Sequence, residues 1–453
     1  MKILLVSPSW DGIVSKRGRR YNKAWPALEL LYIAGFLEKE GIEVRMIDGR
    51  ADPDSIERLR SESAACDKVF ITSSPLDRWE CPNLDLRAFK LWTDRLEPEK
   101  LFVMGAHGTM VPEFIQKEIP CRAILLGEPE ETALDVCRSS NLSQVPGLIY
   151  KEGQRWIKTS PRVPIDLAHL PEPAYHYLDI GRYHYEVLGD KFVILEATRG
   201  CPYTCTYCSL TMQGNRFRKK PVSQVVRDMQ KAVHPLGAET AFFVDLEFTV
   251  DRKYTLELCK ALQEARLPLR WSCQTRVDTV DEEMLVHLKK AGCQLIHYGV
   301  ESGSQRILDL IQKRITLDQI RRGVAMTQKA GIEQLCFFMF GIPGETQAEM
   351  EMTLQLAKEL NPTYASFHVA TPYPTTRLYE LESANGSLAR WGDLGVQLPE
   401  NYGTVENLKH LRSMESKAYR DYYLRPAYLL HRLTQGDPRS WQRQWKLFWG
   451  YAH

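Results

Sequence analysis

The sequence predicts an α/β protein with an N-terminal doubly wound, Rossmann-like sheet, a partial (β/α)6 barrel of the TIM type and a helical C-terminal region. Short runs of β-branched residues and leucine alternate with segments whose apolar residues recur at helical spacing, and a proline-rich stretch divides this alternation into two blocks. Strands that alternate with helices require right-handed crossovers and therefore form parallel sheets. We expect a first domain over residues 1–150, a linker over 151–190, the barrel over 191–385 and the helical region over 386–453.

The composition excludes several classes of protein. Of the 453 residues, 44% are apolar and 26% are charged, which is typical of a globular chain and not of a disordered, collagen-like or disulfide-scaffold protein. Lysine and arginine total 59 against 57 acidic residues, so the formal net charge of +2 provides no overall field that would attract nucleic acid. We therefore expect no nucleic-acid partner.

The N-terminus and the cysteines indicate the compartment. The apolar run that begins near Met1 stops at Ser7 and Pro8, which is too short for a signal-peptide core, and no run approaches the ~20 apolar residues that span a bilayer. The eleven cysteines are an odd count, so they are expected to be free or metal-bound. The sequence predicts a soluble cytoplasmic protein without a membrane span.

The first block predicts five strands that are buried on both faces of a parallel sheet. A helix is expected over Leu28–Lys39, where apolar residues recur at helical spacing and Gly41 provides a C-cap signal. A doubly wound sheet binds ligands at the carboxyl ends of its strands, near the point where the strand order reverses. The expected strands are residues 3–6, 44–47, 68–72, 101–104 and 123–126.

The loops that follow four of these strands are rich in small and hydroxyl-bearing residues. Small residues let a large ligand approach the backbone, and hydroxyls and amides can bind its polar rim. Any one loop could be an ordinary turn, but four loops at one edge of a sheet favour a binding site. These loops are Ser7–Trp10, Ser73–Trp79, Gly105–Thr109 and Gly127–Glu131.

The second block follows a linker whose prolines cannot continue a helix or a central strand, which places the domain boundary there. Its six strand–helix units suit a parallel barrel but fall short of the usual eight, so we expect an open side. The expected strands are residues 192–197, 241–245, 269–274, 294–300, 334–339 and 366–370, and the expected helices are residues 222–233, 254–265, 282–291, 317–330 and 346–360.

The C-terminal region becomes helical, basic and aromatic after Val405. Trp441, Trp445 and Trp449 recur at intervals of four and therefore share one helical face. We expect this stripe to dock the region onto the barrel, which is a commoner role than a ligand platform.

The chemistry-bearing motif is a group of three thiols, Cys201, Cys205 and Cys208, directly after the first barrel strand. Catalytic groups of parallel barrels lie on such strand-to-helix loops. Thiolates at this density select zinc, copper(I) or an iron–sulfur cluster. A structural zinc site needs four protein ligands, and the sequence has no second Cys-x-x-Cys or His pair. A cubane cluster on three thiolates keeps one iron open for catalysis, whereas thioredoxin-type redox chemistry would leave Cys201 without a role.

The Cys-x3-Cys-x2-Cys spacing after a barrel strand resembles the signature of radical S-adenosylmethionine (SAM) enzymes. The resemblance implies that a [4Fe-4S] cluster binds SAM at its free iron and cleaves it reductively to a 5'-deoxyadenosyl radical. Later strand ends resemble the motifs that contact SAM in this family, although acidic residues replace the more common glycine pair around Asp245. The implied SAM contacts are Tyr207, Asp245, Glu247, Gln274, Arg276, Glu301, Ser302, Phe340, Gly341 and Pro372.

Several of these residues also suit SAM by their chemistry. Glu247 can accept hydrogen bonds from an ammonium, and Arg276 can bind a carboxylate through both arms of its guanidinium. Glu301 can accept from a ribose diol, and Gly341 permits close approach of an adenine. Each position alone could be a helix cap or a turn, and their order along the chain is what favours a site.

The segments Lys2–Pro8, Trp25–Ala34, Val103–Thr109 and Leu126–Glu131 are similar to the usual pattern of a cobalamin-binding module, so the first domain resembles that module of one large radical SAM subclass. Asp-x-His-x-x-Gly, the motif that supplies a histidine to cobalt elsewhere, is absent from the sequence, so His107 is not assigned as a cobalt ligand. The loop Leu76–Trp79 is expected to cover the lower face of cobalt. The implied cobalamin contacts are Ser7, Pro8, Trp10, Ser73, Ser74, Leu76, Asp77, Arg78, Trp79, Gly105, Ala106, His107, Gly108, Gly127 and Glu128.

The resemblance implies methylation of an unactivated carbon, with one SAM methylating cobalamin and a second SAM cleaved to the radical, and it implies an electron donor. Thr72–Trp79 is similar to a segment of methanogen C-methylases, which makes a protein or peptide residue, such as a glutamine of methyl-coenzyme M reductase, the expected substrate. A natural product, a tetrapyrrole or an isoprenoid are the alternatives. Radical cyclisation or rearrangement, a cobalamin-binding sensor or scaffold, and a zinc-stabilised binding protein also remain open.

Overall fold

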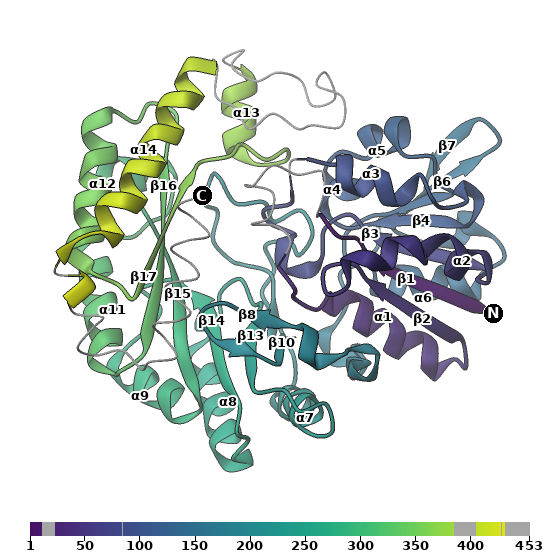
Figure 1. Cartoon of the computed structure of the whole chain (residues 1–453), viewed down its shortest axis with the longest axis horizontal. Helices are drawn as coiled ribbons and strands as arrows, with labels where there is room; N and C mark the ends of the chain where they lie inside the picture. Colours follow the sequence, from purple (N-terminus) through teal and green to yellow (C-terminus); the bar gives the residue numbers. More distant parts are fainter. Residues whose placement is uncertain (11–22, 84, 385–404, 427, 431–453) are drawn as a thin grey trace.

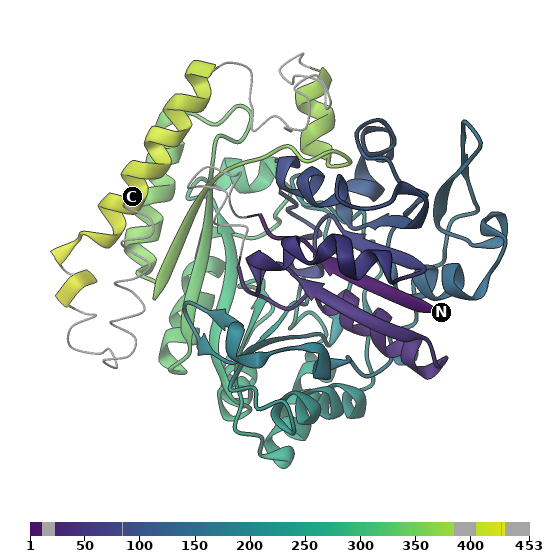
Figure 2. The same cartoon turned by 45° about the vertical axis from the view of Figure 1, so that its right-hand side comes forward.

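The computed structural model describes residues 1–10, 23–83, 85–384, 405–426 and 428–430. Two α/β lobes lie side by side, the N-terminal sheet in one and the barrel in the other (Figures 1 and 2). The α/β architecture predicted from the alternation of strands and helices is confirmed.

The N-terminal sheet has the order β2-β1-β3-β4-β5-β6-β7 within the described residues. The five predicted strands are present and parallel, and the order reverses at β1. The sequence reading missed an antiparallel hairpin, β6 and β7, which extends the sheet into residues expected to be linker. The strands are β1 (Lys2–Ser7), β2 (Glu43–Asp48), β3 (Lys68–Thr72), β4 (Leu101–Met104), β5 (Ala123–Leu125), β6 (Leu148–Glu152) and β7 (Arg155–Lys158).

Helices cover both faces of this sheet. On β1, Ile3 and Leu5 pack with α1 and α6, whereas Leu4 and Val6 pack with α3 and α5 on the opposite face. This alternation explains why β1 consists almost entirely of buried apolar residues. The helices are α1 (Leu28–Lys39), α2 (Leu59–Ala64), α3 (Arg87–Thr93), α4 (Ala106–Met110), α5 (Pro112–Glu118) and α6 (Glu130–Arg138).

The connecting segment packs against the N-terminal lobe along its length. The Ala174 amide donates to the Leu31 carbonyl at 3.1 Å, and the Tyr183 hydroxyl donates to Asp48 at 2.9 Å. A short antiparallel pair, β8 (His184–Tyr185) and β9 (Gly189–Asp190), then leads into the barrel. These contacts hold the connecting segment against the surface of the N-terminal lobe.

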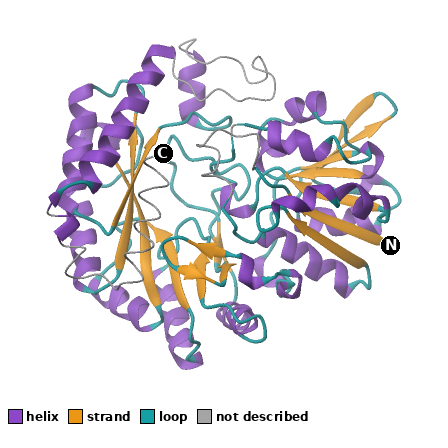
Figure 3. Ribbon diagram, viewed as in Figure 1, coloured by secondary structure: helices purple, strands orange, loops and turns teal. Residues whose placement is uncertain are grey.

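The barrel strands have the order β10-β13-β14-β15-β16-β17, all parallel, and in the described residues they form an open arc with helices outside it (Figure 3). All six strands and five helices predicted for this block are present. The strands are β10 (Phe192–Leu195), β13 (Thr240–Phe243), β14 (Arg270–Thr275), β15 (Cys293–Glu301), β16 (Glu333–Phe340) and β17 (Tyr364–Val369). The helices are α7 (Val222–Val233), α8 (Arg252–Ala265), α9 (Glu282–Lys290), α10 (Gln305–Leu310), α11 (Leu317–Lys329) and α12 (Gln347–Leu360).

After α13 (Arg377–Ala384), helix α14 (Val405–Tyr423) packs on the outer face of β17. The Tyr422 hydroxyl donates to the Pro362 carbonyl, and the Tyr423 hydroxyl donates to the Ala365 carbonyl at 2.8 Å. The helical pattern expected after Val405 is present in α14, while Trp441, Trp445 and Trp449 lie outside the described residues. None of the helices described here combines the length and apolar character needed to cross a membrane.

Candidate active site

The cysteine loop is held at its base by a short antiparallel pair, β11 (Thr198–Arg199) and β12 (Arg218–Lys219). Gly200 follows β11 with a φ of +83°, and a Cβ atom there would lie 2.3 Å from the Arg216 carbonyl oxygen. Only glycine tolerates this combination of conformation and close approach. Cys201 is buried, and Cys205 and Cys208 are partly exposed. The hairpin thus presents all three thiols on one fixed loop.

The chemistry of these thiols fits a cluster. Burial raises the pKa of Cys201 to about 12, and it also raises the pKa of Cys205 against the opposing charge of Lys313. Metal binding would replace these protons with iron. Across the described parts of the chain, no three His, Cys, Asp or Glu side chains converge as ligands of one metal ion. A cubane takes each thiolate on a different iron, so this donor set fits a [4Fe-4S] cluster.

A buried network joins the loop residue Tyr207 to two side chains outside the loop, Glu301 and Lys313. Glu301 accepts hydrogen bonds from the Tyr207 hydroxyl at 2.8 Å and from Lys313 Nζ at 3.2 Å, and Lys313 Nζ lies 3.1 Å from the Tyr207 hydroxyl. Burial alone would lower the pKa of Lys313, but Glu301 and other nearby anionic groups raise it above its usual value. Lys313 was missed by the sequence analysis because it follows α10 and lies outside every strand end.

Arg276 and Glu247 form a second polar group nearby. Arg276 is 1% exposed, binds Asp278 at 2.8 and 3.0 Å, and lies 4.0 Å from the centroid of the Tyr203 ring. Its remaining nitrogen, Nη1, is buried and has no hydrogen-bond partner within the described part of the chain. Glu247 accepts from the Arg276 amide at 2.8 Å, and burial raises the pKa of Glu247 to about 7. A buried donor beside a carboxyl group suits a ligand that carries both an acid and an amine.

Other predicted SAM contacts lie in the framework of the barrel. Asp245 accepts from the Ala197 amide and, at 2.6 Å, from the Thr198 hydroxyl, so it stabilises the turn before the cysteine loop. Ser302 lies 3.2 Å from the Thr353 hydroxyl, and Phe340 stacks on Phe367 towards α14. Gln274 is partly exposed at the end of β14, Gly341 has a φ of +82° and Pro372 is buried. Among the predicted contacts, Tyr207 lies within the cysteine loop, Glu301 and Arg276 contact its Tyr207 and Tyr203 side chains, and Glu247 lies beside Arg276.

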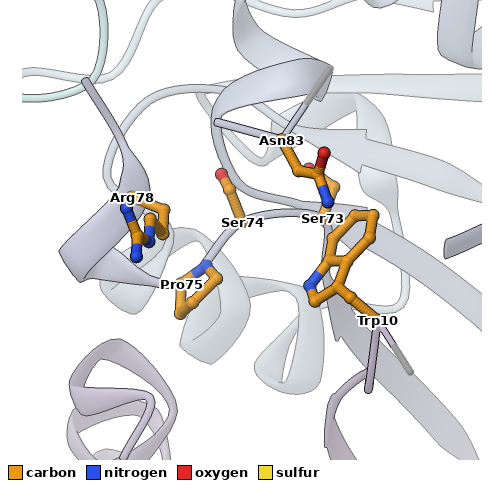
Figure 4. Close-up of a pocket in the computed structure, with 6 residues that line it drawn as sticks. All are labelled: Trp10, Ser73, Ser74, Pro75, Arg78 and Asn83. Atoms are coloured by element: carbon orange, nitrogen blue, oxygen red, sulfur yellow. The ribbon is translucent and has the colours of Figure 1, made fainter. Parts of the chain in front are cut away.

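A pocket lies at the carboxyl edge of the N-terminal sheet, where ligands of doubly wound sheets bind. Gly105 approaches Ser74 so closely that a Cβ would lie 2.8 Å from the Ser74 amide nitrogen, and the Ala106 amide donates to the Ser74 hydroxyl. The Gly127 amide donates to the Thr109 hydroxyl at 2.9 Å. The loops therefore meet as predicted. The pocket is lined by Trp10, Ser73, Ser74, Pro75, Arg78 and Asn83 (Figure 4), of which Pro75 and Asn83 were absent from the expected contacts.

Several predicted cobalamin contacts have other partners. Leu76 and Trp79 are buried in the core between the lobes, Asp77 pairs with Arg50 at 2.8 Å, and Glu128 pairs with Arg218. Ser7 and Gly108 are buried near the strand ends. The side chains of Leu76 and Trp79 thus serve packing, while the neighbouring Arg78 lines the pocket.

Both ring nitrogens of His107 lie within hydrogen-bond distance of other protein atoms. Nδ1 lies 3.1 Å from the Ser73 hydroxyl, and Nε2 lies 2.8 Å from the Asn83 carbonyl oxygen. Burial lowers the pKa of His107 to about 4. A neutral His107 therefore ties together two segments, Ser73 and Asn83, that line the pocket.

This burial predicts an acid-dependent loss of stability. The unfolded chain binds a proton at His107 near pH 6.5, whereas the folded chain resists it until about pH 4, so stability falls as pH decreases between these values. At 1.36 kcal/mol per pKa unit the loss approaches about 3 kcal/mol. Denaturant unfolding at several pH values should show a shallower decline for His107→Gln. His297 is also buried and neutral, but it is present in both the wild type and His107→Gln. Its contribution to the pH dependence therefore cancels when the two are compared. Equal slopes would contradict the prediction.

Buried charges join the two lobes directly behind the cysteine loop. Arg199 is fully buried and binds Glu196 at 2.7 Å in its own lobe and Glu130 at 2.6 Å in the N-terminal lobe. Arg218 forms an ion pair with Glu128, also across the boundary. The cysteine loop is therefore anchored to both lobes.

Two further contacts bring the edge of the N-terminal sheet to the cysteine loop. Ser209, which follows Cys208, lies 4.0 Å from the sulfur of Met110 at the end of α4. Gln213 accepts from the Gly200 amide and donates to Glu80, which follows the pocket residue Arg78 along the chain. Segments at the carboxyl edge of the N-terminal sheet thus contact the loop that carries the thiols.

Comparisons with known proteins identify the class. Residues 195–357 match the radical SAM superfamily. The chain is 31% identical to an uncharacterized methyltransferase of Pyrococcus horikoshii, over 95% of this chain and 94% of that protein. It is 27% identical to the anaerobic magnesium-protoporphyrin IX monomethyl ester cyclase of Cereibacter sphaeroides, over 84% of this chain but only 63% of that protein. The radical SAM methyltransferase TsrM from Kitasatospora setae, solved with cobalamin and a [4Fe-4S] cluster, has a TM-score of 0.67 at 19% identity, over 86% of this chain and 76% of that one.

These findings place the chain in the radical SAM superfamily, whose members use SAM and a [4Fe-4S] cluster. The similarity to the Pyrococcus methyltransferase covers both lobes. The chain is therefore a radical SAM enzyme whose barrel is preceded by an N-terminal α/β domain.

Proposed function

We propose that this chain is a cobalamin-dependent radical SAM methyltransferase that methylates an unactivated carbon. The observation that carries the proposal is the contact between loops at the carboxyl edge of the N-terminal sheet and the cysteine loop, through Ser209 and Met110 and through Gln213 and Glu80. This contact would place cobalamin and the cluster-bound SAM on either side of one substrate. The names of the Pyrococcus relative and of TsrM support the reaction and the cobalamin.

The chain's own residues have separable parts in this proposal. Cys201, Cys205 and Cys208 would hold the cluster, and the unpaired nitrogen of Arg276 would bind the carboxylate of SAM beside Glu247. The loops at the carboxyl edge of the N-terminal sheet, where this small pocket lies, would form part of the surface that holds cobalamin. When bound, cobalamin would carry the methyl group, and the cluster would pass an electron from an external donor to SAM.

The products of SAM test the reaction. A methyltransferase of this type yields S-adenosylhomocysteine and 5'-deoxyadenosine together, because one SAM gives its methyl group and another gives the radical. We expect both in near-equal amounts from reduced, cluster-loaded protein with substrate, measured by liquid chromatography. Only 5'-deoxyadenosine would favour a cyclase, the second candidate, which the Cereibacter relative supports. A loaded cluster without SAM cleavage would favour a cobalamin-binding sensor or scaffold.

The substrate we propose is a protein or peptide residue, such as a glutamine of methyl-coenzyme M reductase. The segment Thr72–Trp79, which is similar to a segment of methanogen C-methylases, and the six-stranded order of the described barrel, two strands short of the usual eight, support it. A reductase-derived peptide should gain the mass of one methylene when it is incubated with reduced enzyme, SAM and methylcobalamin. The same peptide with asparagine in place of the glutamine is the control. An unchanged glutamine peptide would remove this substrate and leave the reaction class standing.

A further inference from the structure

We infer that Lys313 sets the reduction potential of the cluster by holding a buried positive charge against the cysteine loop. The inference rests on the proposed assignment of the cluster to Cys201, Cys205 and Cys208. It concerns a residue that neither the sequence motifs nor the comparisons single out, and it does not depend on cobalamin, on methyl transfer or on the identity of the substrate.

Two contacts fix Lys313 to the middle of the cysteine loop. Its ammonium nitrogen lies 3.1 Å from the hydroxyl of Tyr207, the residue directly before Cys208. The amide of Thr206, directly after Cys205, donates to the Ile311 carbonyl at 3.0 Å. The segment that carries Lys313 is therefore tied by its main chain and by its side chain to the two residues between these thiols.

The backbone around this lysine is held in conformations that are unfavourable for ordinary residues. Gln312 and Arg314 flank Lys313 with φ angles of +54°, and Glu301 has a φ of +71°. Such conformations persist where the surrounding structure imposes them, and they cluster at functional sites. At Gly299, a Cβ atom would lie 2.7 Å from the Lys313 nitrogen and 2.4 Å from a Glu301 carboxylate oxygen, so a glycine leaves the space that the pair occupies.

The charges of the network determine the direction in which the reduction potential of the cluster shifts. Lys313 is 5% exposed, so water screens its field only weakly, and its ion-pair partner Glu301, at 3.2 Å, carries the opposing charge. Reduction adds one electron from an external reductant to the cluster, changes its core from 2+ to 1+, and transfers no atom. Net charge near a cluster is one of the properties that set its potential. A nearby cation favours the reduced form, and a nearby anion opposes it.

The experiment is a potentiometric titration of the full chain with its cluster loaded and without SAM, using dithionite and redox mediators and following the reduced cluster by electron paramagnetic resonance. For Lys313→Met we expect a more negative midpoint, with at least a tenfold loss in the equilibrium constant for reduction, which is 59 mV for one electron. Lys313→Arg should stay close to wild type. Glu301→Gln should shift the midpoint in the opposite direction, which a merely structural role would not produce.

Lys220→Met is the matched control, because Lys220 is also buried and paired, with Asp228 and the Tyr32 hydroxyl, but lies outside the cysteine loop. Its midpoint should equal that of wild type. Unchanged midpoints for Lys313→Met and Glu301→Gln, or shifts of the same sign, would overturn the inference. If Lys313→Met loads no cluster, the midpoints of the other two variants decide. The inference then requires a less negative midpoint for Glu301→Gln and a midpoint close to wild type for Lys313→Arg. A wild-type chain that binds no cluster would instead overturn the cluster assignment itself.

Discussion

Replacement of Cys205 by alanine is expected to abolish the iron–sulfur cluster and, with it, the reductive cleavage of SAM. The cysteine loop offers three thiols, and Cys205, which is partly exposed, is the middle one of the three. Two thiolates cannot complete the protein ligands of a cubane that keeps one iron for SAM. Iron and sulfide content, visible absorbance and the yield of 5'-deoxyadenosine after oxygen-free reconstitution should all fall to background.

The matched control is Cys66→Ala. Cys66 is 3% exposed and packs in the core of the N-terminal lobe, so its loss removes a small buried side chain without touching the loop. This variant should keep full iron content and SAM cleavage. Full iron content in Cys205→Ala, with SAM still cleaved, would refute the assignment of the cluster to these cysteines.

The fold was predictable because it is encoded in local periodicity. The bounds of α1 and α7 agree with the sequence prediction, since their apolar residues recur at helical spacing up to clear end signals. The β6–β7 hairpin was missed because β7, over Arg155–Lys158, has no buried residue and thus no run of apolar residues to mark it. The hairpin forms because Gly153 makes its turn with a φ of +58°. Its first strand, β6, pairs with the edge of β5.

The site was predictable only where it is local in sequence. The cysteine loop is one short stretch, whereas Lys313 reaches it by folding of a segment about a hundred residues away. Among strand ends, the sequence located Glu301 and Phe340 but could not assign their faces, because a shift of one residue in a strand reverses the direction of every side chain. Glu301 accordingly faces the loop, while Phe340 packs against Phe367 on the other side.

Replacement of Arg199 by methionine is expected to destabilise the protein by about 3–5 kcal/mol, the usual effect of removing one partner from a buried ion pair. Arg199 is fully buried between Glu130 and Glu196, which are themselves 1% and 2% exposed. Methionine fills much of the volume but leaves these carboxylates without a counter-charge. Denaturant unfolding should report the loss, whereas Arg321→Met, which breaks an ion pair with Glu359 on the surface, should have a small effect.

The same variant can separate lost charge balance from lost packing. Burial already raises the pKa of Glu130 and Arg199 opposes that rise, so without Arg199 the carboxyl should hold its proton to higher pH. A proton bound in the folded state stabilises it, so the deficit of Arg199→Met should shrink as pH falls. Adding Glu130→Gln should recover part of the loss, because the uncompensated charge is removed. A deficit that is independent of pH and unaffected by Glu130→Gln would mean that Arg199 acts through packing against Tyr32 and Trp79.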